Sequence, residues 1–154
     1  MSVRFFSAIL FVSLFGCSRL DLFEKVVFTP KQEWDQSFQP EFTFDIEDTV
    51  STYKVFFIIR HADAYAYNNI WIKLTSKLPG DKTIRDERFD VQLATEKRWL
   101  GSGMDDLYDH RVLLYRDPVR FNKPGRYTLR ISQDMRIDPL DYIFNVGIRL
   151  EKVK

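Results

Sequence analysis

The two histidines are the first side chains to examine for chemistry, because imidazole acts as an acid, a base or a metal ligand near neutral pH. His61 and His110 lie far apart in the sequence, and neither forms an HExxH or HxH pattern. The chain also has no GxSxG, GxxxxGK or GxGxxG motif, so neither a hydrolase nucleophile nor a phosphate-binding loop is indicated. We interpret both histidines as core or surface residues, and we predict no catalytic residue and no cofactor.

Three carboxylates, Asp105, Asp106 and Asp109, precede His110 and follow the glycine-containing turn at residues 101–103. Their oxygens suit calcium, but this ion takes roughly six to eight oxygen ligands and the segment has no DxDxDG loop. A pair of carboxylates can also hydrolyse a glycosidic bond, provided that the fold sets the right separation. We interpret the segment as a solvated loop with a short helical turn at residues 104–108, and we predict no metal site.

Cys17, the only cysteine, ends an apolar segment at the N-terminus. Arg4 is the only charged side chain before it, and residues 5–16 are all apolar or small. Such a run is too short for a membrane-spanning helix, which needs roughly 20 apolar residues, and is typical of a secretory signal peptide. A single cysteine forms neither an intramolecular disulfide nor, unaided, a cysteine-based zinc site.

The end of this segment, residues 14–17, resembles the lipobox of bacterial lipoproteins, with a small residue, Gly16, directly before the cysteine. A lipobox implies cleavage between Gly16 and Cys17 and a thioether from the Cys17 sulfur to a diacylglycerol. Two or three acyl chains make a lasting membrane anchor, whereas one chain binds reversibly. An uncleaved signal anchor and a secretory signal cut at another position are the alternatives.

Aromatic and amide side chains crowd a predicted turn and strand start at residues 65–71. Flat rings can stack on the apolar faces of sugars while amides bond the hydroxyls, so this segment could form a carbohydrate platform. Aromatic residues at strand edges also pack against their neighbours, which is the competing interpretation. The candidates for a binding surface are Tyr65, Tyr67, Trp71, Trp99 and Tyr108.

The elements that would position these residues are β-strands, because apolar and polar residues alternate repeatedly after residue 40. The alternating segments are residues 42–46, 70–74, 89–93, 127–131 and 144–150. Residues 53–60 are apolar at nearly every position, which predicts a central strand covered on both faces. Residues 22–29 and 111–115 complete about eight strands, with turns at 78–81 and 123–125 and a short helical turn at 31–36.

This pattern predicts an all-β chain that forms a single antiparallel β-sandwich, either jelly-roll or immunoglobulin-like, after a lipoprotein signal peptide. We expect a signal peptide at residues 1–16, a lipidated tether at 17–21 and the sandwich domain at 22–154. The 23 Lys and Arg nearly balance the 22 Asp and Glu, so bulk charge gives no reason to expect a nucleic-acid partner.

Several ordered segments resemble the GldH family of gliding-motility lipoproteins from Bacteroidota, from about residue 20 to the C-terminus. These segments are YNNIWI (67–72), RWLGSG (98–103), YDHR (108–111), FNKPGRYTLRISQDMR (121–136) and NVGIRLEK (145–152). None of them is a catalytic signature. The lipobox-like start of the chain agrees with this resemblance.

The resemblance implies a lipid-anchored, non-enzymatic envelope protein of surface gliding, in a system tied to type IX secretion and the movement of surface adhesins. Its partners would be membrane lipid, through acylated Cys17, and envelope proteins of that machinery, with the oligomeric state left open. Ser18, where sorting rules would place an aspartate for inner-membrane retention, favours the outer membrane, and we expect its periplasmic face. The alternative function is a carbohydrate-binding β-sandwich module on an envelope lipoprotein.

Overall fold

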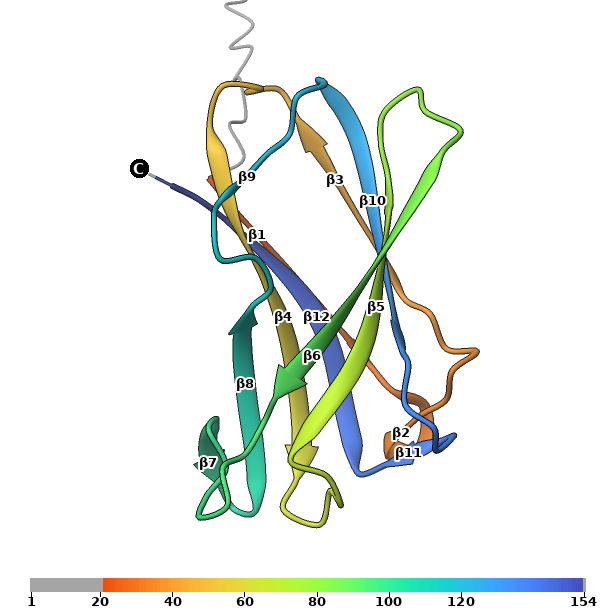
Figure 1. Ribbon diagram of the computed structural model, residues 1–154, viewed down its shortest axis with the longest axis vertical. Helices are drawn as coiled ribbons and strands as arrows, with labels where there is room; N and C mark the ends of the chain where they lie inside the picture. The colour runs from red at the N-terminus through yellow and green to blue at the C-terminus, as the bar shows by residue number, and fades with distance from the viewer. Residues whose placement is uncertain (1–20, 154) are drawn as a thin grey trace, which may run out of the picture.

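Two antiparallel β-sheets pack face to face in the computed structural model, which describes residues 21–153 (Figure 1). The larger sheet contains, in order, β1 (Leu22–Phe28), β12 (Ile143–Lys152), β4 (Thr52–Ala62), β8 (Leu107–Leu113) and β7 (Ser102–Met104), with β9 (Val119–Arg120) also paired to β4. The smaller sheet contains β3 (Glu41–Ile46), β10 (Gly125–Gln133), β5 (Asn69–Lys77) and β6 (Ile84–Gln92). A 3-10 turn, η1 (Pro30–Gln32), leads into β2 (Glu33–Trp34), which pairs with β11 (Leu140–Asp141). The predicted all-β sandwich is confirmed.

The strand order identifies the sandwich as a jelly roll. Among the eight long strands, the chain crosses from one sheet to the other at every step except the hairpin from β5 to β6. In an immunoglobulin-like sandwich, by contrast, the first two strands of the chain share a sheet. The two architectures left open by the sequence are therefore resolved in favour of the jelly roll.

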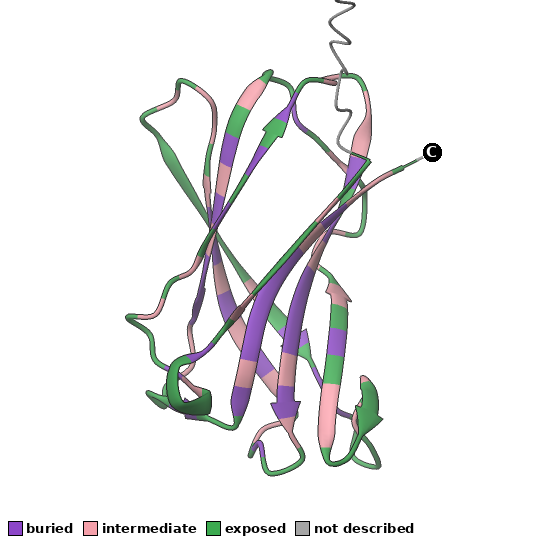
Figure 2. Ribbon diagram, turned by 180° about the vertical axis from the view of Figure 1, so that it is seen from behind, coloured by how far each residue is buried: buried purple, intermediate pink, exposed green. Residues whose placement is uncertain are grey.

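The core fills the space between the sheets, because alternate side chains of a strand point to opposite faces. On β3, Phe42, Phe44 and Ile46 are buried and the residues between them are exposed. Phe44 lies opposite Tyr127 of β10, and the two rings stack at a centroid distance of 5.9 Å. Figure 2 shows the same alternation as purple and green bands along the strands.

Strand β4 is central, as expected, but its two faces are not equally covered. Its neighbours in the sheet are β12 and β8, while only the face with Tyr53, Val55, Phe57 and Ile59 meets the other sheet. On the outer face Ile58 is buried, whereas Phe56 is only partly buried and Lys54 is exposed. The apolar run at residues 53–60 therefore indicates a strand in the middle of the sheet, with a strand on each side and one face buried in the core. It does not require a second layer over the other face.

The helical turn expected at residues 104–108 is a β-hairpin instead. Strand β7 ends at Met104 and β8 begins at Leu107, so Asp105 and Asp106 form a two-residue turn. Their φ angles are 50° and 64°, the left-handed values that a tight hairpin turn requires at both central positions. The helical turn expected at residues 31–36 is only partly present, because η1 is followed at once by β2.

A β-bulge near the start of β12 changes which side chains reach the core. Ile143 pairs with His61 and Asn145 with Arg60, so Phe144 is an extra residue in the ladder. Ile143 is fully buried, whereas Phe144, which the alternation placed on the core face, is only partly buried. The bulge shifts the face by one residue, and the alternation holds from Val146 to Leu150.

Candidate functional site

The two histidines touch each other in the interior of the sandwich. The antiparallel pairing of β4 with β8 sets Ile59 opposite His110, and His61 opposite Tyr108, on the core face. The Nε2 atoms of His61 and His110 are 2.9 Å apart, and the two side chains are 0% and 4% exposed. Residues that the sequence separates by nearly 50 positions are thus hydrogen-bonded to each other.

The hydrogen bonds of this pair fix its protonation. The Nδ1 atom of His61 lies 2.8 Å from the carbonyl oxygen of Ala62, which can only accept, so we assign a proton to this Nδ1. The Nε2 of His61 then accepts, and the Nε2–H of His110 donates to it. Burial lowers the pKa of His61, and burial together with the neighbouring His61 lowers the pKa of His110 to about 4. Both rings are therefore neutral at pH 7.

Four of the five residues predicted for a binding surface gather around His61. The rings of Trp99, Tyr65 and Tyr108 lie 4.3, 5.3 and 5.8 Å from the His61 ring, and Tyr67 packs edge-on against Tyr65. Tyr65 is buried, and burial raises its pKa well above the usual value, so its hydroxyl stays protonated and donates to the Asn69 carbonyl oxygen. This arrangement is a packed cluster at the end of the sandwich where β4 ends.

Trp71 lies apart from that cluster. Its ring is covered by the guanidinium of Arg88, whose central carbon is 4.1 Å from the ring centroid. Arg88 also bonds Asp134, so an ion pair holds the cation over the ring. A role in binding for Trp71, or for the cluster around His61, stays a prediction.

The acidic segment does not converge on one point. Asp109 lies on the outer face of β8, where both of its oxygens are 2.7 Å from the Arg60 guanidinium, while its neighbour His110 points into the core. Asp105 and Asp106 occupy the hairpin turn. Within residues 21–153, no three side chains among His, Cys, Asp and Glu lie together as metal ligands would. Over the same residues, no helix has the length and apolar character needed to cross a bilayer.

Gly101 is required for the approach of the chain to the histidine pair. A Cβ atom at this position would lie 2.5 Å from the Asp109 carbonyl oxygen and 2.8 Å from the His110 Nε2. A side chain at this position would require the backbone of β8 or the hydrogen-bonded imidazole to move, and either movement would destabilise the fold. In place of the turn expected at residues 101–103, Gly101 makes a close packing contact, and Ser102 and Gly103 already belong to β7.

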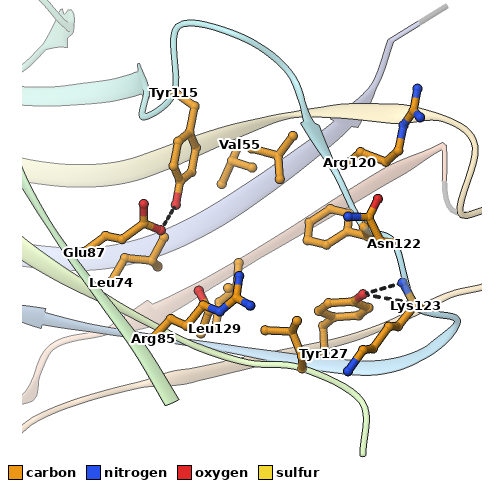
Figure 3. A pocket seen from close by; sticks show the side chains of 14 residues that line it. Val55, Leu74, Arg85, Glu87, Tyr115, Arg120, Asn122, Lys123, Tyr127 and Leu129 are labelled. Carbon is orange, nitrogen blue, oxygen red and sulfur yellow. Dashed lines mark hydrogen bonds between the residues drawn. The ribbon is translucent and has the colours of Figure 1, made fainter. Parts of the chain in front are cut away.

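A cavity of about 390 Å³ opens between the sheets at the other end of the sandwich (Figure 3). Its apolar wall includes Val55, Leu74, Phe121 and Leu129, which come from β4, β5, β10 and the segment before β10. Its charged lining residues are Arg85, Glu87, Arg120 and Lys123. Pockets of this volume accept small molecules.

Sequence reasoning did not identify this cavity, because its residues come from five separate segments. One signal was present in β6. Counting back in steps of two from the inward-facing Phe89 places Glu87 and Arg85 on the core-facing side, where apolar residues are expected. Charged residues on the inward face mark the point where the two sheets separate and the interior becomes accessible.

Fold and site together describe a jelly-roll protein with a histidine and aromatic cluster at one end and a cavity with a basic rim at the other. The sequence profile of the family described as "GldH lipoprotein" matches residues 21–150, and the chain belongs to this family.

Two relatives match over nearly the whole chain. The "Gliding motility lipoprotein GldH homolog" of Christiangramia forsetii is 30% identical, covering 96% of this chain and 91% of the relative. The "Gliding motility lipoprotein GldH" of Flavobacterium johnsoniae is 24% identical, covering 92% of this chain and 91% of the relative. The family resemblance predicted from the sequence is confirmed.

Among solved structures, the chain is similar to the crystal structure of CBM28, a carbohydrate-binding module specific for non-crystalline cellulose. The TM-score is 0.48 at 12% identity, over 85% of this chain and 73% of that one. This similarity is too low to support an argument about ligand or function.

Proposed function

We propose that the protein is a non-enzymatic accessory component of the gliding-motility machinery, linked to type IX secretion and to the movement of surface adhesins. The observation that carries this proposal is the family match over residues 21–150, together with two gliding-motility relatives over nearly their full length. A small sandwich can supply binding faces and no energy source. The force for movement therefore comes from other envelope proteins, which this one would bind.

The anchor that we propose is the acylated Cys17, freed by cleavage after Gly16, in the outer membrane and facing the periplasm. These residues lie outside the described part of the chain. Asp21, the first described residue, is fixed to the sandwich, because its carbonyl oxygen accepts a hydrogen bond from the Lys152 backbone N–H. Four residues of extended chain span at most about 14 Å. The tether at residues 17–21 would thus hold the sandwich close to the bilayer surface.

A clean deletion of the gene in a gliding host tests the proposed role. We expect the deletion to stop colony spreading and the wild-type gene, restored on a plasmid, to recover it. Co-purification from intact envelopes should recover proteins of the gliding or secretion machinery with the tagged chain. Normal spreading of the deletion strain would contradict the proposal.

The anchor is tested separately by metabolic labelling with palmitate. Cys17→Ser should lose the label, because the hydroxyl replaces the thiol that forms the thioether, whereas the matched variant Ser18→Ala should keep it. Label retained in Cys17→Ser would place the anchor elsewhere.

A further inference from the structure

The cavity between the sheets combines an apolar interior with a charged rim. Val55, Leu74 and Leu129 are almost fully buried and form its floor, and Phe121 and Tyr127 close one side. The hydroxyl of Tyr127 is already satisfied, because it donates to the Lys123 carbonyl oxygen and accepts from the Lys123 backbone N–H. The floor therefore offers contact to an apolar group and no free polar partner from Tyr127.

The rim carries more positive than negative charge. Arg85, Arg120 and Lys123 line it, and Glu87 is the one carboxylate among the lining residues. Glu87 accepts a hydrogen bond of 2.5 Å from the Tyr115 hydroxyl, which holds it against one wall (Figure 3). Lys123 lies 3.8 Å from Asp81, outside the lining, whereas no ion pair within 4.0 Å joins Arg85 or Arg120 to a carboxylate of the described residues. Arg120 alternates with the core-facing Val119, and Figure 3 shows its guanidinium directed away from the cavity. An anionic group at the rim would therefore meet Arg85, which has no such pair, and Lys123.

The segments that line the cavity include β9 and the chain that leads into β10, and they lie at the end of the molecule where the described chain begins (Figure 1). Asp21 bonds Lys152, the backbone N–H of Val153 bonds Thr52, and Thr52 pairs with Arg120 of the rim. These contacts follow the sheet from β1 across β12 and β4 to β9. Neighbouring strands are about 4.8 Å apart, so three spacings set Asp21 roughly 15 Å from Arg120.

We propose that this cavity binds a single-chain anionic amphiphile, that is, an acyl chain with a carboxylate or phosphate head. The chain lies on the apolar floor, which removes its methylene groups from water, and the head lies at the rim beside Arg85 and Lys123. Supply of this ligand from the membrane rests on the anchor proposed above, because the short tether keeps the rim near the bilayer. The binding itself depends only on the cavity.

Photo-crosslinking tests this proposal on the full chain, purified from membranes and reconstituted in phosphatidylcholine vesicles. The probe is a fatty acid with a diazirine in its acyl chain, and mass spectrometry of digested protein locates the adducts. We expect adducts in segments that line the cavity, namely residues 115–123 and 74–78. Adducts confined to residues 17–20, or spread evenly over the surface, would overturn the proposal.

Two variants separate the floor from the rim. Ser76 lies opposite Arg85 in the β5–β6 ladder and lines the cavity, so Ser76→Trp fills the space without removing an apolar contact. The double variant Arg85→Gln and Lys123→Gln removes the two cations of the rim. Each should reduce cavity adducts about tenfold, equivalent to 1.4 kcal/mol. The matched control, Arg126→Gln with Arg130→Gln, removes the same charge from the outer face of β10 and should leave the adducts unchanged.

The source and the charge of the ligand are tested with two further probes. A diazirine-bearing lysophosphatidic acid, which has one acyl chain and a phosphate head, should label the cavity, and labelling above the free fatty acid would identify membrane lipid as the source. Equal labelling by a zwitterionic lysophosphatidylcholine would overturn the role of the rim. Cys17→Ser should keep cavity labelling by the free fatty acid even if it loses the anchor, so failure of the anchor and failure of the cavity give different results.

Discussion

At the scale of single residues, the buried histidine pair makes the fold sensitive to acid. Burial lowers the pKa of both rings, to about 4 for His110, while the unfolded chain keeps the ordinary value near 6.5. Protons therefore bind the unfolded state more tightly, and the neutral pair stabilises the fold above pH 6.5. This stabilisation is lost as the pH falls from 6.5 towards 4.

We expect the free energy of unfolding to decrease by on the order of 2 to 3 kcal/mol between about pH 7 and pH 4 through His110 alone. Urea denaturation followed by tryptophan fluorescence measures this change. His110→Gln keeps a donor towards His61 but removes the titration, so its loss over the same range should be smaller. Asp105→Asn, in the exposed hairpin turn, is the matched control and should follow the wild type. An unchanged pH profile in His110→Gln would contradict the assignment.

The individual residues of the cluster could be predicted from the sequence, but their contacts could not. The aromatic residues around position 65 stand out in the sequence, and four of the five candidates do meet in space. The contact between His61 and His110 depends on the register of β4 against β8. That register is set by core packing of the whole sheet, and no local pattern reports it.

At the scale of the elements, the bulge at the start of β12 leads to a prediction that distinguishes two adjacent residues. Ile143→Ala should destabilise the protein by about 2 to 5 kcal/mol, because it leaves a cavity in a filled interior. Phe144→Ala should cost less, although phenylalanine is larger, because this side chain is only partly buried. Chemical denaturation of the two variants tests the order. A greater loss for Phe144→Ala would show that the sequence alternation, and not the bulge, sets the core face.

The strands were predictable because burial on one face imposes alternation on the sequence. The exceptions have physical causes. The hairpin at Asp105 and Asp106 uses left-handed backbone without glycine or asparagine, so the usual turn signal was absent. The bulge adds one residue, which no composition pattern marks. The inward charges of β6 interrupt the alternation at the cavity, where these side chains line open space and are not packed in the core.

At the scale of the whole molecule, strand order was not predictable, because alternation shows that a residue is buried but not which strand lies beside it. The structure pairs the first long strand with the last, Leu22 opposite Glu151, and sets β12 between β1 and β4. Removal of β12 would therefore divide the larger sheet, leaving β1 on one side and β4, β8 and β7 on the other.

Truncation tests this dependence on the last strand. A chain that ends at Tyr142 should lose cooperative unfolding and become sensitive to protease, because β1 and β4 would both lose a neighbour. A chain that ends at Lys152 keeps every β12 pairing and should behave like the full chain. Circular dichroism and limited proteolysis measure both. Cooperative unfolding of the shorter chain would show that the sandwich closes without β12.

The late position of β12 in the chain also determines when the protein can fold. Synthesis proceeds from the N-terminus at about 5 to 20 residues per second, so β1 lacks its partner, and β4 one of its two neighbours, until β12 has emerged. A nascent chain of this kind stays open until β12 has emerged. For a polypeptide that the proposed signal peptide would send through a narrow translocation channel, such delayed closure keeps the chain threadable until it reaches the compartment where it works.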